Sequence, residues 1–409
     1  MIIHADRIAA DIEVIGACSE CPVVDGHSRP TFSGAWGKAR AYVVGELERA
    51  GCVVRVDAAG NLHGRQGGGG WGEKVFLSGS HLDSVPTGGK FDGVVGVAAP
   101  LEILRAAHEA GERVGLELVV FAEEEGTTFN LGMLGSRAWV GTLSGEELGG
   151  LKNKQGQSYL EAGAAFGVDP ARLAGERFDP AGYRGFIEVH VEQGVGLWEA
   201  NAPVALVTAI NGRRQYAVTL TGDANHAGST KMGHRRDALA AAAEMVGALE
   251  VLAHDLDRRQ DHTVITVGRL MVEPNALNVI AGRVHFYIDL RARSDAMLSE
   301  GDRLIRAEVK RIAHRRRMGW AVEQTEELPA MAMDAALCGR LREAAERLGV
   351  VMPEAASGAL HDAAILAPFL PTAMLFVASK DGVSHNPGEY SRIEEIAAAT
   401  SILAEAVRA

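Results

Sequence analysis

Several protein classes are excluded by what this sequence lacks. Its 409 residues contain four cysteines, and the one CxxC, formed by Cys18 and Cys21, has no second pair to complete a four-cysteine zinc site. No run of about 18 apolar residues is present, so no membrane span is expected. The first residues lack the basic and apolar segments of a signal peptide. We therefore expect reduced thiols in a cytoplasmic protein that has no membrane partner.

Basic residues are also in deficit. The chain has 41 Lys and Arg against 53 Asp and Glu, which gives a net charge of −12. An acidic surface disfavours nucleic acid and anionic membranes as partners. Hydrophobic residues make up 47% and charged residues 23%, a globular composition. The length exceeds one typical core and suggests two domains, or one large domain with an insertion.

Strand and helix patterns alternate along the first half of the chain. We expect a buried strand at 74–80, a helix at 94–111 and an apolar strand that begins at Gly115 and runs into the glutamates at 123–125. This order predicts a mainly parallel sheet covered by helices. Sites in such sheets form outside the carboxyl ends of the strands, where His81 and the three glutamates fall.

The pattern changes near Asn211. Six elements are expected beyond it: a strand at 213–223, a helix at 234–256, strands at 263–270 and 278–292, a helix from Leu298, and a final strand. They describe a compact sandwich with an antiparallel sheet. We therefore predict an α/β protein in which residues 1–210 and 328–409 form the mainly parallel-sheet domain. Residues 211–327 form an inserted, smaller α+β sandwich.

The stretch GSHLDSVPTGGKFDG, residues 79–93, concentrates possible metal ligands. Its glycines would let the loop fold back so that His81 and Asp92 meet. The Asp83 carboxylate could accept the second imidazole N–H of His81 and fix its tautomer. Histidine and carboxylate ligands suit zinc, manganese or cobalt. Further candidates stand elsewhere in the chain: Glu124, Glu125, His190 and His385.

Each of these residues alone admits a structural explanation. His190 could be a satisfied core histidine, and residues 123–125 could be an exposed acidic turn. In combination, three glutamates directly after a strand as apolar as LELVVFA are costly unless a positive charge meets them. A dinuclear metal centre would supply that charge.

The ordered motifs resemble those of a known family. They are GSHLDSVPTGGKFDG, FAEEEGTTF, GFIEVHVEQG, NHAGSTKMGHRRD, NALNVIAGRVHFYIDLRA, SGALHDA and GVSHNPGE. Together they resemble the M20-like zinc-dependent amidohydrolases, a group that includes N-carbamoyl-L-amino-acid hydrolases, beta-ureidopropionases and allantoate amidohydrolases. The resemblance covers nearly the whole chain. It implies a di-metal hydrolase domain, a dimerisation or lid domain at 211–327, and a homodimer with two divalent ions per subunit (zinc, or manganese or cobalt).

The resemblance also implies metal ligands. His81 and His190 resemble the ligands of one metal, and Glu125 and His385 those of the other. Asp92 resembles the carboxylate that bridges the two metals.

Catalytic roles follow from the same resemblance. Glu124 resembles the general base, Asp83 lies behind His81, and Glu123 is left as support. His226 is the candidate donor to the tetrahedral oxyanion. HD at 361–362 could be a helix cap, or could line the pocket.

Substrate contacts are implied for Gln193, His226, Asn278, Arg291 and His361. Arg291 could hold a substrate carboxylate through two parallel hydrogen bonds, supplemented by Asn278. Alternatively, both residues form a salt bridge or a strand-end hydrogen bond. The contacts from the inserted domain are expected to reach the metals on domain closure, some of them from the partner subunit.

The implied reaction is hydrolysis of the ureido bond of an N-carbamoyl-L-amino acid, a small carboxylate. It gives the amino acid, CO2 and ammonia through a metal-bridging hydroxide, with Glu124 as base. Allantoate, N-carbamoyl-beta-alanine and N-acyl amino acids are alternative substrates. A non-catalytic small-acid-binding protein and a dimer with structural metals are alternatives of another class. Five ligands shared by two metals leave positions open for water, which favours catalysis.

Two departures from the family pattern bear on the substrate. Residues 229–232 are Ser-Thr-Lys-Met where the family commonly has Thr-Thr-Pro-Met, and Leu360 stands where glycine is frequent. Both could lie near the rim of the pocket. The chemistry is therefore better specified by the sequence than the identity of the substrate.

Overall fold

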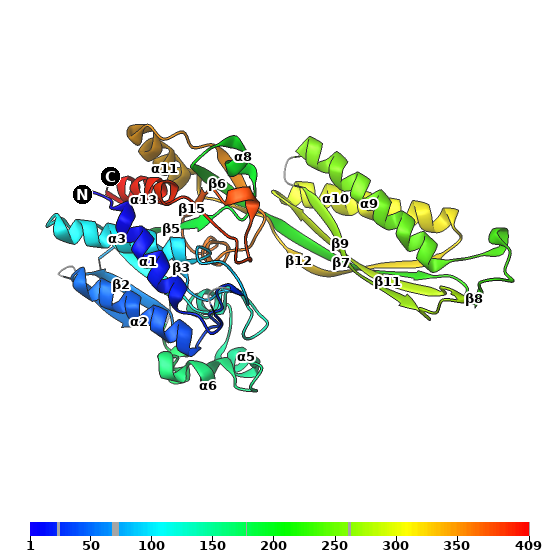
Figure 1. The fold of residues 1–409 in the computed structure, drawn as a ribbon, viewed down its shortest axis with the longest axis horizontal. Coiled ribbons are helices and arrows are strands. Elements are labelled where there is room, and N and C mark those ends of the chain that lie inside the picture. The colour runs from blue at the N-terminus through cyan, green and yellow to red at the C-terminus, as the bar shows by residue number, and fades with distance from the viewer. Residues whose placement is uncertain (23–24, 68–72, 177, 261–262, 409) are drawn as a thin grey trace. The chain divides into compact units, whose positions relative to one another are not determined.

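The computed structural model describes residues 1–22, 25–67, 73–176, 178–260 and 263–408 (Figure 1). These residues form two compact units. The first unit comprises 1–208, 333–355 and 360–409, and the second comprises 209–332 and 356–359. The divisions lie close to those expected at 210 and 328. The functions expected of the two units stay predictions.

A large mixed sheet forms the centre of the first unit. Its strand order is β1-β2-β4-β3-β5-β15-β6-β13, with β14 paired to β6. The pairs β4–β3, β3–β5 and β5–β15 are parallel, which confirms the predicted parallel centre, and the flanking pairs are antiparallel. The strands are β1 Cys52–Val56, β2 Leu62–Gln66, β3 Val75–His81, β4 Leu116–Phe121, β5 Tyr183–Val191, β6 Val204–Ile210, β13 Met331–Ala332, β14 Glu354–Ser357 and β15 Thr372–Val377.

The central strands are buried along their whole length. Every residue of β3, β4 and β15 is buried, as expected for strands covered on both faces. The longer helices of this unit pack on the sheet and on one another: α1 Ala5–Ala17, α2 Gly34–Arg49, α3 Val94–Glu109, α11 Ala335–Leu348 and α13 Ile393–Arg408. Helix α3 starts directly after the loop that carries Asp92, so this loop is fixed between a central strand and a buried helix.

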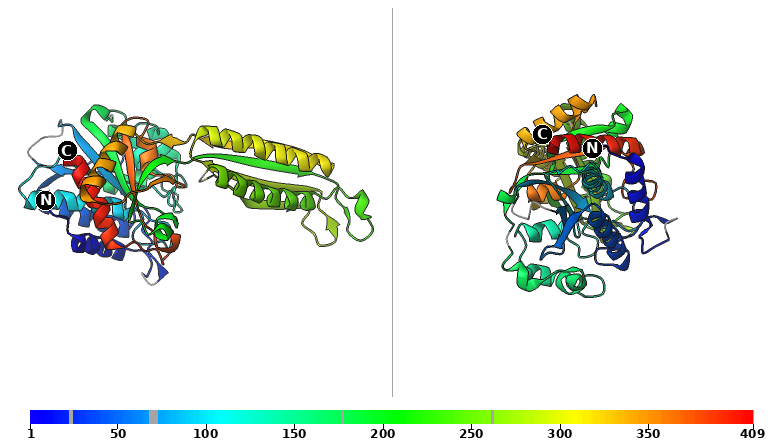
Figure 2. Two further views of the ribbon diagram at one scale, coloured as in Figure 1. Left: turned by 90° about the horizontal axis from the view of Figure 1, so that it is seen from above. Right: turned by 90° about the vertical axis from the view of Figure 1, so that its left-hand side faces the viewer.

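The second unit is a two-layer sandwich, as predicted. Helices α9 and α10 lie side by side over one face of the antiparallel sheet β12-β7-β11-β9 (Figure 2, left). The main elements are β7 Gly212–Thr221, α9 Ala238–Gln260, β9 Val264–Glu273, β11 Arg283–Ala292, α10 Asp295–Arg315 and β12 Gly319–Leu328. Alternate residues of β11 point into the core, and the others lie on the open face of the sheet.

Two boundaries in this unit differ from the sequence prediction. The strand expected at 278–292 is two strands, β10 Val279–Ile280 and β11, and β10 pairs with β8 Asn225–His226. The chain changes partner at Gly282, where a Cβ would lie 2.9 Å from the backbone of Ala224. Helix α9 begins later than predicted because the Asp237 side chain accepts the N–H groups of the next turn.

All four cysteines are free thiols, as predicted. Burial raises the pKa of Cys52 to about 12 and that of Cys338 to about 11, so both stay protonated near neutral pH. Among the helices that the structure describes, none combines the length and the apolarity needed to cross a membrane.

Candidate metal centre

The predicted ligands lie at the carboxyl ends of the parallel strands in the first unit. His81 is the last residue of β3, and His190 lies one residue before the end of β5. Asp92 reaches them because the next residue is Gly93, with a φ of 68°. A Cβ at Gly93 would lie 2.5 Å from the ring of His81, so a side chain there would clash with that histidine.

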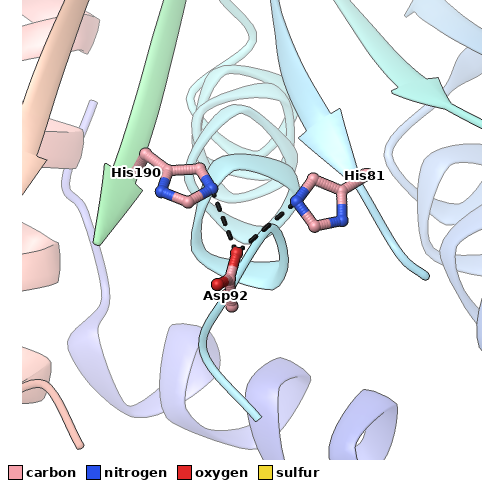
Figure 3. Close-up of side chains that lie close together, drawn as sticks. All are labelled: His81, Asp92 and His190. Carbon is pink, nitrogen blue, oxygen red and sulfur yellow. Dashed lines mark ion pairs between the residues drawn. The ribbon is translucent and has the colours of Figure 1, made fainter. Parts of the chain in front are cut away.

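The first ligand group consists of His81, Asp92 and His190, all buried. Asp92 Oδ1 lies 3.5 Å from His81 Nε2 and 3.2 Å from His190 Nε2 (Figure 3). Two ligand atoms that are each about 2.0–2.1 Å from a tetrahedral zinc ion lie roughly 3.3 Å apart. The separations in this group therefore suit ligands that share one cation.

The second ligand group consists of Asp92, Glu125 and His385. His385 Nε2 lies 3.3 Å from Asp92 Oδ2 and 3.6 Å from Glu125 Oε2. Asp92 thus offers one oxygen to each group, which is the arrangement expected of a bridging carboxylate. The His385 side chain is 49% exposed, so this group is open on one side.

The two buried histidines are oriented by main-chain carbonyls. His81 Nδ1 donates to the Asp83 carbonyl at 2.9 Å, and His190 Nδ1 donates to the Val191 carbonyl at 2.9 Å. With Nδ1 as the donor, the neutral form of each ring has its lone pair on Nε2, on the side of Asp92, and this is the form in which histidine binds a metal.

The Asp83 side chain does not make the hydrogen bond that the sequence suggested. Its carboxylate lies 3.8 Å from His81 Nδ1, which bonds to the main chain instead. The two carboxylate oxygens accept the N–H groups of Glu124 at 3.3 Å and Glu125 at 3.1 Å. Asp83 therefore holds the acidic turn beside the histidines.

The acidic turn at 123–125 is largely buried, so the alternative of an exposed turn is wrong. Glu123 is fully buried and adopts a left-handed φ of 57°. Its Oε1 accepts the N–H groups of Thr128 at 2.7 Å and Phe129 at 2.8 Å. The side chains of Glu124 and Glu125 are 11% and 7% exposed. Glu124 Oε2 lies 3.7 Å from His81 Nε2, and Glu124 belongs to neither ligand group.

The site holds more buried carboxylates than its own positive charges can neutralise. Burial raises the pKa of Glu124 well above its usual value, and burial with repulsion from Asp92 raises that of Glu125 to about 7. Burial alone would lower the pKa of His81, but the surrounding carboxylates outweigh it and raise that pKa well above its usual value. His81 Nε2 and Glu125 Oε1 are buried and make no hydrogen bond to any residue that the structure describes. Divalent cations would satisfy both atoms and the excess carboxylates.

Gln193 and His361 both border the ligand groups. Gln193 Nε2 donates to Asp92 Oδ2 at 2.8 Å, and Gln193 and His385 both have left-handed φ angles, 57° and 51°. The His361 ring is buried, with its centroid 4.4 Å from that of His190. His361 precedes α12 (Asp362–Leu366) but its side chain makes no cap hydrogen bond, so the cap alternative is wrong for this histidine.

One buried carboxylate in this region was missed from the sequence. Glu188 forms a third possible ligand group with His190 and His361. It already accepts the Ser80 hydroxyl at 2.8 Å and the Ala363 N–H at 3.1 Å. The available signal was its position two residues before His190, which places both side chains on the same face of β5.

The remaining predicted residues belong to the second unit. His226, on β8, pairs directly with Val279 of β10, which follows Asn278, so His226 and Asn278 are neighbours and both are exposed. His226 Nδ1 accepts the N–H groups of Gly228 at 3.0 Å and Ser229 at 3.2 Å. Its proton therefore sits on Nε2, which donates to no residue in the described part of the chain.

Arg291 lies near the far end of β11 from β10 and β8. Arg291 Nε forms an ion pair with Asp289 Oδ1 at 2.9 Å. The salt-bridge alternative is therefore correct for one edge of this guanidinium.

A buried charged array supports the strand that leads to the acidic turn. His63 on β2 is fully buried, with Nδ1 2.8 Å from Glu117 Oε1 and Nε2 3.2 Å from Asp57 Oδ2. Asn61 continues the array by donating to Asp57 Oδ2 at 2.8 Å and accepting the Ala122 N–H at 3.1 Å. Ala122 directly precedes the acidic turn, so the array fixes the main chain at the point where the turn begins.

This array makes the stability of the protein depend on pH. Burial alone would lower the pKa of His63, but its hydrogen bonds to Asp57 and Glu117 raise it to about 9. A pKa raised from 6.5 to about 9 corresponds to on the order of 3 kcal/mol of stability. Because the folded-state pKa is raised, this contribution is complete below about pH 6.5 and is lost as the pH rises through about 9.

The His63→Gln variant tests this contribution. In urea unfolding, the wild-type protein should exceed the variant in stability most strongly near pH 6, and the difference should shrink by about 3 kcal/mol near pH 10. A difference that does not change with pH would contradict a charged His63.

The whole chain resembles known amidohydrolases. Residues 77–409 match the family described as Peptidase family M20/M25/M40. The N-carbamoyl-L-amino acid amidohydrolase of Geobacillus stearothermophilus is 38% identical over 404 residues, which cover 98% of this chain and 97% of that protein. The allantoate amidohydrolase of Escherichia coli (strain K12) is 33% identical over 383 residues, 93% and 92% of the two chains.

Solved structures of amidases also resemble this chain over almost its whole length. The amidase of the hydantoinase/carbamoylase family from Burkholderia multivorans is 34% identical, with a TM-score of 0.88 over 99% of this chain and 97% of that chain. A match of this extent includes the inserted sandwich as well as the unit that holds the ligand groups.

Proposed function

Since the chain belongs to the peptidase family M20/M25/M40, we propose that it hydrolyses the ureido bond of N-carbamoyl-L-amino acids. One water is consumed, and the amino acid, CO2 and ammonia are released. The observation that carries the proposal is the convergence of two ligand groups on one shared carboxylate, Asp92. The carboxylate of Glu124 lies beside these groups and belongs to neither. The N-carbamoyl-L-amino acid amidohydrolase named above supports the substrate class.

The residues present fit two divalent cations. His81, Asp92 and His190 would hold one, and Asp92, Glu125 and His385 the other. Imidazole and carboxylate donors suit zinc, manganese or cobalt. When bound, such cations polarise a carbonyl and lower the pKa of water. Asp83 and Gln193 contribute by fixing the positions of the ligands, Asp83 through the acidic turn and Gln193 through Asp92.

Glu124 is the proposed general base. Its carboxylate faces the same space as His81 Nε2, yet it is in neither ligand group, so it remains available to accept a proton. Burial raises its pKa, which makes the carboxylate a stronger base than an exposed glutamate. Glu124 would take the proton from the attacking water and pass it to the leaving nitrogen.

Residues of the second unit are proposed to bind the substrate. The free Nε2–H of His226 suits a donor to the oxyanion, with Asn278 beside it. Arg291 would bind the substrate carboxylate. We also propose that the functional unit is a homodimer, which sedimentation of the metal-loaded protein would test.

The Arg291→Ala variant is expected to raise KM for carboxylate substrates by roughly 10- to 100-fold, because a charge-assisted hydrogen bond in a binding site contributes about 1.5–3 kcal/mol. The value of kcat should change little. Steady-state kinetics with an N-carbamoyl-L-amino acid measure both constants. An unchanged KM would remove Arg291 from the binding site.

Allantoate is the second candidate substrate. The allantoate amidohydrolase of Escherichia coli (strain K12) is nearly as similar over a comparable share of the chain. Allantoate also carries a carboxylate and ureido groups, so the same ligand groups would serve it. The departures from the family pattern at residues 229–232 and at Leu360 favour neither of the two substrates over the other.

A substrate screen with metal-reconstituted enzyme tests the proposal. The panel contains N-carbamoyl-L-amino acids, N-carbamoyl-beta-alanine, allantoate and N-acyl amino acids, with ammonia or amine release as the signal. We expect the highest kcat/KM for an N-carbamoyl-L-amino acid. A clear preference for allantoate would replace this substrate, and no turnover of any ureido or amide bond would overturn the proposed function.

A further inference from the structure

We propose that Asp289 and Gln215 are positioning residues that hold the guanidinium of Arg291 in place, so that its free edge can receive the substrate carboxylate. The inference rests on the proposed function, in which Arg291 binds that carboxylate. It adds the residues that prepare Arg291 before substrate arrives. All residues involved belong to the second unit.

The strand geometry brings these side chains together. Asp289 and Arg291 are two residues apart on β11, so both lie on the open face of the sheet, while Ile288 and Leu290 point into the core. Gln215 on β7 is the direct cross-strand partner of Asp289. The set is therefore placed by the sheet register and not by a mobile loop.

Hydrogen bonds to described residues use two of the three guanidinium nitrogens of Arg291, Nε and Nη1. Asp289 Oδ1 accepts from Arg291 Nε at 2.9 Å, and its Oδ2 accepts from Gln215 Nε2 at 2.9 Å. Arg291 Nη1 also donates to the Gly358 carbonyl at 2.9 Å. Within the described residues, Nη2 has no hydrogen-bond partner. The remaining N–H groups of Nη1 and Nη2 form a planar fork on a residue that lines the pocket, and such a fork binds a carboxylate through two hydrogen bonds.

A pocket surrounds this fork. The open face of the sheet has a cavity of about 440 Å³ that is lined by Gln215, Asp289, Arg291 and Tyr287, among others. Its volume is within the range of small-molecule sites. A second cation, Arg269, lies over the ring of Tyr287 at 5.1 Å, so the lining of the pocket holds two arginines and one carboxylate, Asp289. The pocket thus keeps net positive charge even though Arg291 is paired.

Positioning matters here because a free arginine side chain has many rotamers. Binding a carboxylate to an unheld arginine would require those rotamers to be lost at the moment of binding. Asp289 and Gln215 remove this cost beforehand. Their loss should weaken substrate binding and the preference for a carboxylate, and leave the chemical step intact.

The test compares Asp289→Ala with a matched control, Asp302→Ala. Asp302 is also 24% exposed and also binds an arginine Nε, that of Arg306 at 2.7 Å, but on helix α10. Each enzyme is assayed with an N-carbamoyl-L-amino acid and with its carboxamide, and the ratio of the two kcat/KM values gives the carboxylate preference. We expect Asp289→Ala to lower this ratio about ten-fold through KM, and Asp302→Ala to leave it unchanged.

Asp289→Asn separates position from charge. Its amide oxygen can still accept from Arg291 Nε, and Gln215 can turn its own amide to match, so most of the preference should return. An unchanged ratio in Asp289→Ala, an equal fall in Asp302→Ala, or an Asn variant as impaired as the Ala variant would each overturn the inference. The proposed function fails separately, in the wild-type enzyme, if no ureido substrate is turned over.

Discussion

Replacing Glu124 by glutamine should lower kcat by roughly two to four orders of magnitude and leave the bound metal unchanged. General acid–base catalysis by a placed side chain contributes about 10²- to 10⁴-fold, and glutamine cannot accept the proton. Metal should be retained because Glu124 belongs to neither ligand group. Single-turnover kinetics and metal analysis of the same preparation measure both quantities.

The neighbouring carboxylate provides the contrast. Glu125→Gln removes a member of the second ligand group and should lose metal as well as activity. The N–H groups of both residues are held by Asp83, so the two variants share the same main-chain environment. If Glu124→Gln turned over substrate at nearly the normal rate, another group would have to be the base.

Asp92→Ala is expected to abolish metal binding at both ligand groups. Asp92 Oδ1 lies beside His81 and His190, and Oδ2 lies beside His385, so one substitution removes a ligand from each group. The loss of activity should exceed the roughly 10- to 100-fold that follows when a metal ligand loses an outer hydrogen-bond partner. Metal content per chain, by elemental analysis after dialysis, is the direct measurement.

Single-group variants are the controls for Asp92. His190→Ala takes a ligand from the first group alone, and Glu125→Ala takes one from the second alone. Each should therefore retain more metal than Asp92→Ala. An Asp92→Ala protein that holds as much metal as either of them would show that the two groups do not share this carboxylate.

The strands that could be predicted from the sequence are those that consist of continuous runs of apolar residues. Strands β3, β4 and β15 are continuous apolar runs because both of their faces are buried, so their position and parallel pairing could be predicted. Strand β2 is also mostly buried, but it reads LHGRQ. Its polar side chains are buried because His63 and Arg65 pair with Glu117. The spacing of apolar residues in the sequence cannot predict such pairs.

At the site, the sequence identified side chains that meet but not all of their hydrogen bonds. His81, Asp92 and Glu125 could be inferred because strand ends and a glycine-rich loop bring them to one edge of the sheet. The role of Asp83 was misjudged because a histidine N–H can choose between a carboxylate and the carbonyl of the same residue. That choice depends on angles within one turn, which residue types do not reveal.

Glu123, Gln193 and His385 share a left-handed backbone conformation that glycine or asparagine would adopt at lower cost. All three lie at or beside the ligand groups, so the strain of this conformation lowers the stability of the fold at the place where the metal ligands are positioned. Selection for heat resistance would therefore find easy gains at these positions and would erode turnover with each one. Stabilising substitutions should therefore be sought in the sandwich unit, at positions that neither the ligand groups nor the proposed substrate contacts use.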